Sequence, residues 1–110
     1  MFAGTDTAYQ LAKKHKIKVA FGTDNLFDAR NAAAQGHQLA RLSKWFTPAE
    51  ILIMATSSNA ELLALCGERN PYPGKLGVVE AEAYADLLIV DGNPIENLSL
   101  IEDPEMNLRL

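Results

Sequence analysis

Asp24 is the residue in this sequence best suited to chemistry, because it stands at the end of a short apolar run. Residues 20–25 read Ala-Phe-Gly-Thr-Asp-Asn, so the run ends in a glycine, a hydroxyl and a carboxylate. A carboxylate at the end of a buried strand can ligate a metal ion or accept a proton from water. The alternative is a polar turn that the Asp24 carboxylate caps, and the stretch "GTD" alone favours that alternative.

The other candidates for chemistry are His15, His37, Cys66 and the pair Ser57-Ser58. The two histidines are not spaced as His-x-His or His-x-x-x-His, and a catalytic zinc site needs about three protein ligands. We interpret both histidines as structural, Cys66 as a buried inert thiol and the two serines as helix-capping residues. The residues alone therefore offer one good catalytic candidate and no complete site.

Three elements must position Asp24. Helical spacing of apolar residues predicts a helix over Asp6–Lys16, and a β-branched and aromatic stretch predicts a strand over Ile17–Phe21. Small residues at helical spacing predict a further helix over Asp28–Leu42. A helix, a strand and a helix form an αβα unit, in which ligands bind at the carboxyl ends of strands. Asp24 lies at that end of the predicted strand.

Two helix starts follow in quick succession. Residues 47–50 read "TPAE" and residues 58–61 read "SNAE", and each stretch has the composition of a capping box. In the first stretch a proline occupies the first helical position, where its missing N–H is not needed. These signals predict helices over Pro48–Ala55 and Asn59–Cys66.

The C-terminal part of the chain contains two strand candidates, "KLGVVE" at Lys75–Glu80 and "ADLLIVD" at Ala85–Asp91. Residues Leu87–Val90 are apolar at every position, so we expect cover on both faces of this strand. A short helical turn is predicted near Ile95–Leu100, after the turn residues that follow the second strand.

Composition excludes several classes of protein. The chain has 110 residues, of which 48% are hydrophobic and 22% are charged, as in an ordinary globular domain. Its net charge is -4 and its 10 basic residues do not cluster, so no nucleic-acid partner is expected. No apolar run approaches the roughly 20 residues that cross a bilayer, and the start lacks the features of a signal peptide. We therefore expect a soluble, cytoplasmic protein that does not enter a membrane.

Three stretches, in this order, resemble the C-terminal part of the metal-dependent amidohydrolase superfamily. They are "VAFGTD", "TPAEILIMATSSNAELLAL" and "GKLGVVEAEAYADLLIVDGNPIENLSLIEDP". The subgroup they resemble most contains imidazolonepropionase-like and Xaa-Pro dipeptidase-like hydrolases. Each motif is weak by itself, but the ordered set is specific and covers nearly the whole chain. One departure is Glu82, which stands where the family has a turn glycine.

The resemblance implies an α/β fold class and two segments. Residues 1–70 would be the C-terminal end of a (β/α)8 TIM barrel, with residues 17–22 as its last strand. Residues 71–110 would belong to the small β-sandwich domain that such enzymes assemble from both chain ends. A full barrel takes roughly 250 residues, so we expect this chain to be a fragment of one.

The resemblance also implies a chemistry. Asp24 would match the family aspartate that ligates the metal and activates the hydrolytic water. The metal would be divalent, with zinc favoured, and the other ligands (a His-x-His, a lysine or glutamate and two more histidines) would lie outside this chain. The full-length enzyme would hydrolyse a C–N bond in a small-molecule amide, cyclic amide or dipeptide substrate. We expect this chain alone to bind no metal and to be inactive.

The competing hypothesis is a non-catalytic α/β domain that self-associates. Such a domain could also fold alone. The fragment hypothesis predicts a homodimer or a higher homo-oligomer, because the strands at Ile17–Phe21 and Leu87–Val90 need partners that a chain of this length does not provide. A two-fold dimer is favoured, since an isologous contact satisfies two equal edges together.

Overall fold

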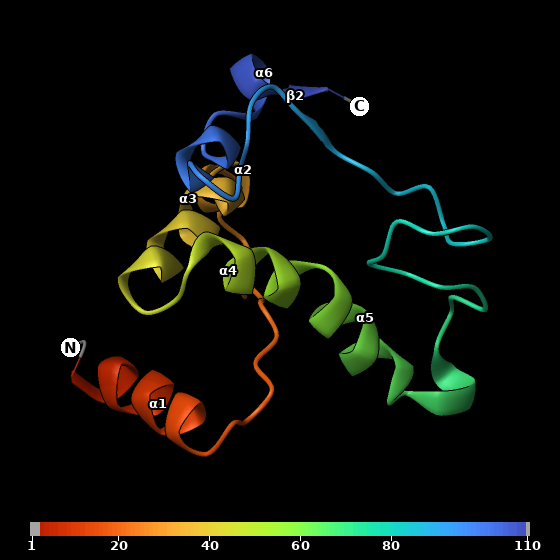
Figure 1. Cartoon of the computed structure of the whole chain (residues 1–110), viewed down its shortest axis with the longest axis horizontal. Coiled ribbons are helices and arrows are strands. Elements are labelled where there is room, and N and C mark those ends of the chain that lie inside the picture. The colour runs from red at the N-terminus through yellow and green to blue at the C-terminus, as the bar shows by residue number, and fades with distance from the viewer. Residues whose placement is uncertain (1–2, 110) are drawn as a thin grey trace.

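The Ile51 side chain has no exposed surface, and the core of the protein forms around it. The structure is a computed structural model that describes residues 3–109. Ile51 lies in helix α4 (Pro48–Ala55), which crosses the middle of the molecule between α1 and the C-terminal segments (Figure 1). Helix α4 also contributes Met54, and the other buried apolar side chains of the core come from the helices and turns on either side of it: Leu39, Leu42, Phe46 and Leu98.

Helix α1 (Ala3–Lys14) ends two residues earlier than the sequence predicts. Its end has the hydrogen bonds of a Schellman motif, with Ile17 N–H donating to the Ala12 carbonyl (2.8 Å) and Lys16 N–H to the Lys13 carbonyl (3.2 Å). Lys16 adopts a φ of 52°, in the left-handed region that usually takes glycine at this position. The chain then leaves α1 in an extended conformation.

The single helix predicted over Asp28–Leu42 is wrong, because the segment forms three short pieces. These are α2 (Ala29–Ala33), α3 (Gln35–Ala40) and a 3-10 helix, η1 (Arg41–Lys44). Ala34 separates the first two with φ -98° and ψ 25°, outside helical geometry. Small side chains make few packing contacts, and most of the stability of a helix in a protein comes from such contacts. The spacing of the small residues alone therefore does not reveal where the helix breaks.

Gly36 explains how α3 packs against the C-terminal region. A Cβ added at Gly36 would lie 2.1 Å from the Ile101 carbonyl oxygen, so no larger residue fits there. Ile101 is the last residue of η3 (Leu98–Ile101), a 3-10 helix. Its residues overlap the range Ile95–Leu100, where the sequence predicts a short helical turn. The close approach of α3 and η3 places Leu98 in the core.

Helix α4 begins and ends where the sequence predicts. The predicted capping box is present: the Thr47 hydroxyl accepts from Glu50 N–H, and the Glu50 carboxylate accepts from Thr47 N–H at 2.7 Å. The second predicted capping box is wrong. Helix α5 (Ser57–Ala64) begins after Thr56, which makes no side-chain cap, and the Thr56 hydroxyl donates back to the Leu52 carbonyl.

Residues 17–22 are extended but pair with no described strand, so the predicted strand at Ile17–Phe21 is wrong as a paired strand. Its alternation is nevertheless kept, with Val19 and Phe21 packed against the core. The Phe21 N–H donates to the Met54 carbonyl (3.3 Å) and to Asn59 Oδ1 (2.9 Å) instead of to another strand.

The strands predicted in the C-terminal part form only in part. Lys75–Glu80 makes one isolated bridge, between Lys75 and Ala83, and only Ile89–Val90 (β1) of the second candidate is a strand. Strand β1 pairs antiparallel with β2 (Leu108–Arg109), so Ile89 stands opposite Arg109. Residues 71–88 form a long irregular segment beyond α5 (Figure 1).

The expected cover over Leu87–Val90 is also absent among residues 3–109. Leu87, Leu88 and Ile89 are 49%, 59% and 65% exposed. Glu82, the residue that departs from the family glycine, adopts a φ of 65° in the region that favours glycine. The described chain is therefore a small mixed helix–strand domain with one two-stranded sheet, and it does not contain the parallel strand pairs of a barrel.

Candidate functional site

Asp24 lies in the extended segment that follows Val19 and Phe21, just beyond the residues packed on the core. Its side chain is exposed and its φ is 50°, a left-handed conformation that aspartate tolerates better than most residues. Within residues 3–109 the Asp24 carboxylate makes no hydrogen bond and no ion pair. Asp24 is thus presented to solvent with its acceptor oxygens free.

The expectation that Asp24 caps the next turn is wrong, because Asp28 has that role. Asp28 Oδ1 accepts from the N–H groups of Arg30 (3.0 Å) and Asn31 (3.2 Å) at the start of α2. Ordinary helix capping therefore does not account for the carboxylate at Asp24.

The Asn25 side chain links the turn that contains Asp24 to helices α2 and α3 by hydrogen bonds. Its side-chain amide donates to the Asn31 carbonyl (2.9 Å), and its oxygen accepts from Gln38 Nε2 (3.1 Å). Sequence reasoning missed this role, although an asparagine in a turn is a common side-chain bridge to backbone groups. The backbone beside Asp24 is held in place while the Asp24 side chain stays free.

The structure does not bring the other candidate residues to Asp24. His37 Nδ1 lies 2.6 Å from Glu102 Oε2, and His15 is exposed beyond the end of α1. Cys66 is exposed, so its interpretation as a buried thiol is wrong. In the part of the chain that the structure describes, no group of three or more histidine, cysteine, aspartate or glutamate side chains could hold a metal ion. The described residues do not form a zinc site by themselves.

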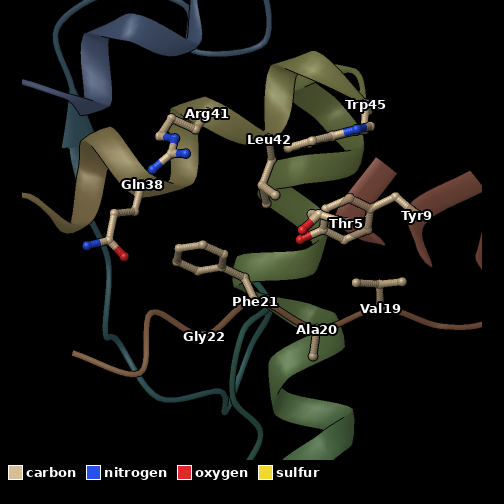
Figure 2. A pocket seen from close by; sticks show the side chains of 10 residues that line it. All are labelled: Thr5, Tyr9, Val19, Ala20, Phe21, Gly22, Gln38, Arg41, Leu42 and Trp45. Carbon is tan, nitrogen blue, oxygen red and sulfur yellow. The ribbon is translucent and has the colours of Figure 1, made fainter. Parts of the chain in front are cut away.

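A pocket of about 290 Å³ adjoins the extended segment on the side of α1, α3 and η1 (Figure 2). Aromatic side chains form much of its wall. The Tyr9 ring lies 4.9 Å from the Trp45 ring and 5.1 Å from the Phe46 ring, measured between centroids. The ten residues that line the pocket are Thr5, Tyr9, Val19, Ala20, Phe21, Gly22, Gln38, Arg41, Leu42 and Trp45.

Comparison with protein-family profiles, curated proteins and solved structures finds no match to this chain. Among the described residues, no helix combines the length and the apolar character needed to cross a membrane. Function must therefore be inferred from the residues of the chain itself.

Proposed function

We propose that this chain is the C-terminal portion of a metal-dependent amidohydrolase and that Asp24 is its catalytic carboxylate. One observation supports this proposal most directly. Asp24 stands at the carboxyl end of an extended apolar segment, exposed and without a partner among residues 3–109, whereas Asn25 and Asp28 beside it are bound to helices. A free carboxylate on a fixed backbone is suited to ligate a divalent metal, with zinc favoured, and to accept a proton from water.

The proposed parent enzyme would supply the remaining ligands and the rest of a TIM barrel. Residues 17–22 would be the last barrel strand, and their lack of a strand partner among residues 3–109 is compatible with neighbours outside this chain. Residues 71–110 would belong to the accompanying β-sandwich domain. The substrate would be a small amide, cyclic amide or dipeptide, and the sequence predicts a cytoplasmic location.

The decisive experiment examines a longer protein that contains this segment. We expect a His-x-His about one barrel length upstream, and Asp24→Asn in that protein should lower hydrolysis by about 10²- to 10⁴-fold without unfolding it. Asp28→Asn is the matched control, because asparagine caps a helix as well as aspartate does. An Asp24→Asn rate within a few-fold of wild type, or an upstream region without the histidines, would overturn the proposal.

The 110-residue chain gives a second test. A single carboxylate cannot hold a catalytic metal in a defined open geometry, so a zinc-supplemented assay with dipeptides and acyl-amino acids should give only background. Hydrolysis above background that disappears in Asp24→Asn would contradict the inference that this chain alone lacks a complete catalytic site.

A second candidate function is a non-catalytic α/β domain that self-associates. The exposed apolar run at Leu87–Ile89 favours this candidate, since such a run usually meets another surface. Metal analysis separates the two. The non-catalytic domain should bind no stoichiometric zinc, and a parent amidohydrolase should carry zinc that depends on Asp24.

A further inference from the structure

The pocket beside residues 19–22 combines apolar walls with polar side chains that have no hydrogen-bond partner among residues 3–109. Figure 2 shows Arg41 and Gln38 on one side of the Phe21 ring, and Tyr9 and Thr5 on the other. All lining residues belong to this chain, and they come from α1, the extended segment, α3 and η1 with the turn after it. At about 290 Å³ the pocket is at the small end of ligand sites, which suits a compact molecule.

Three donors in the pocket are available to a ligand. Within residues 3–109, the Arg41 guanidinium and the hydroxyls of Thr5 and Tyr9 make no hydrogen bond, and Arg41 makes no ion pair. The side-chain amide of Gln38 is already engaged, because it donates to Asn25 Oδ1. The Arg41 guanidinium therefore lies on one side of the Phe21 ring, and the two hydroxyl-bearing side chains lie on the other (Figure 2).

The charge in the pocket is positive. The lining contains Arg41 and no aspartate or glutamate. Asp6, the acidic residue next to the lining residue Thr5, is already occupied, since its carboxylate accepts from Lys44 Nζ (2.9 Å) and from Trp45 Nε1 (2.7 Å). The Arg41 guanidinium has no such partner in the part of the chain that the structure describes, and its planar set of donors matches a carboxylate.

We propose that this pocket binds a small aromatic carboxylate. The ring of the ligand packs among Phe21, Tyr9 and Leu42, and its carboxylate pairs with the Arg41 guanidinium. Aromatic rings attract one another beyond the effect of buried area, and an ionised acceptor about doubles the strength of a hydrogen bond. A neutral aromatic molecule of the same shape keeps the aromatic packing but lacks the charge-assisted hydrogen bond to Arg41.

Trp45 provides the readout, because it is the single tryptophan in the chain and lines the pocket. Titration of the 110-residue protein with benzoate should change Trp45 fluorescence saturably. Benzamide, which is neutral and nearly the same shape, should bind about tenfold more weakly or worse, as expected for loss of a charge-assisted hydrogen bond.

Arg41→Gln should weaken benzoate binding by about tenfold and leave benzamide binding nearly unchanged. The matched control is Arg69→Gln, because Arg69 is an exposed arginine outside the pocket lining and its loss should change neither affinity. Circular dichroism of both variants establishes that they fold. The proposal is overturned if benzoate does not saturate, if benzoate and benzamide bind equally, or if Arg41→Gln and Arg69→Gln behave alike.

Discussion

The indole nitrogen of Trp45 donates a 2.7 Å hydrogen bond to the carboxylate of Asp6, and this contact ties α1 to the turn before α4. Lys44 Nζ donates to the same oxygen at 2.9 Å. Helix α1 has no buried residue of its own, so its attachment rests on this contact, on Lys13, whose Nζ donates to the Trp45 carbonyl, and on the Tyr9 ring, which packs against Trp45 and Phe46. Thr5 and Tyr9 of α1 also line the pocket beside residues 19–22, so the contacts that hold α1 position this wall of the pocket as well.

Asp6→Ala should release α1 and lower the free energy of unfolding, because the Trp45 indole N–H loses its acceptor. Urea unfolding followed by Trp45 fluorescence measures both the stability and the local change around the indole. Asp86→Ala is the matched control, since Asp86 is exposed and has no hydrogen bond or ion pair within residues 3–109. Equal midpoints for the two variants would contradict a structural role for the Asp6 carboxylate.

The same contact predicts a pH dependence. Hydrogen bonds from Lys44 and Trp45 hold the pKa of the Asp6 carboxyl below its ordinary value of 3.8. A lowered folded-state pKa stabilises the fold above the unfolded-state pKa, and this stabilisation is lost as the pH falls through the folded-state value. Wild type should therefore lose more stability than Asp6→Ala as the pH falls below about 3.8.

Local signals allowed α4 to be predicted, and non-local contacts explain most of what sequence reasoning missed. Thr47 and Glu50 are three residues apart, so the sequence pattern alone predicts their capping box. Asp6 and Trp45 are 39 residues apart, and no local pattern pairs them. The segment at Ile17–Phe21 is a second example. Its residue types predict an extended conformation, but the hydrogen-bond partners of its Phe21 N–H are backbone and side-chain groups that lie far away in the sequence.

Thr47→Ala should destabilise the protein by about 0.5–2 kcal/mol, because Glu50 N–H loses its cap at the start of α4. Ser58→Ala is an informative control. The sequence predicts a capping role for Ser58, whereas α5 begins at Ser57 and is not capped by a side chain, so this variant should change stability by less than about 0.5 kcal/mol. A Ser58→Ala loss as large as that of Thr47→Ala would favour the sequence-based helix start.

Ile51→Ala should cost about 2–5 kcal/mol, since it empties the most buried position of the core. Ile53→Ala, two residues along the same helix, should cost far less because Ile53 is 54% exposed. Thermal unfolding by circular dichroism compares the two, and the difference tests the orientation of α4. A similar cost for both would mean that α4 presents a different face to the core.

Lys16→Gly should stabilise the protein. A residue with a Cβ costs roughly 1–2 kcal/mol in the left-handed conformation, and glycine gives back about 0.5–1 kcal/mol through unfolded-state entropy. The net gain should be about 0.5–1 kcal/mol at the φ of 52° adopted by Lys16. His15→Gly is the control, since His15 does not have a positive φ and should lose stability instead. A loss for both variants would argue against the Schellman end of α1.

Two features of the fold bear on the oligomeric state. Residues 17–22 are extended without a strand partner in the described structure, and their backbone groups other than the bonded N–H groups of Ile17 and Phe21 can act as a template for another chain. Strand β1 already pairs with β2, but Ile89 of β1 and the preceding residues Leu87 and Leu88 remain exposed.

We therefore expect the chain to self-associate, as a two-fold dimer in the simplest arrangement, because an isologous contact covers two equal apolar surfaces at once. Light scattering coupled to size exclusion at tens of micromolar protein should give a mass above that of the 12.0 kDa monomer. Leu88→Lys should shift the equilibrium toward monomer by placing a charge in the contact. Val79→Lys is the control, because Val79 is also exposed but lies outside the Leu87–Ile89 run. A clean monomer with cooperative unfolding would instead indicate that the exposed leucines belong to an autonomous small domain.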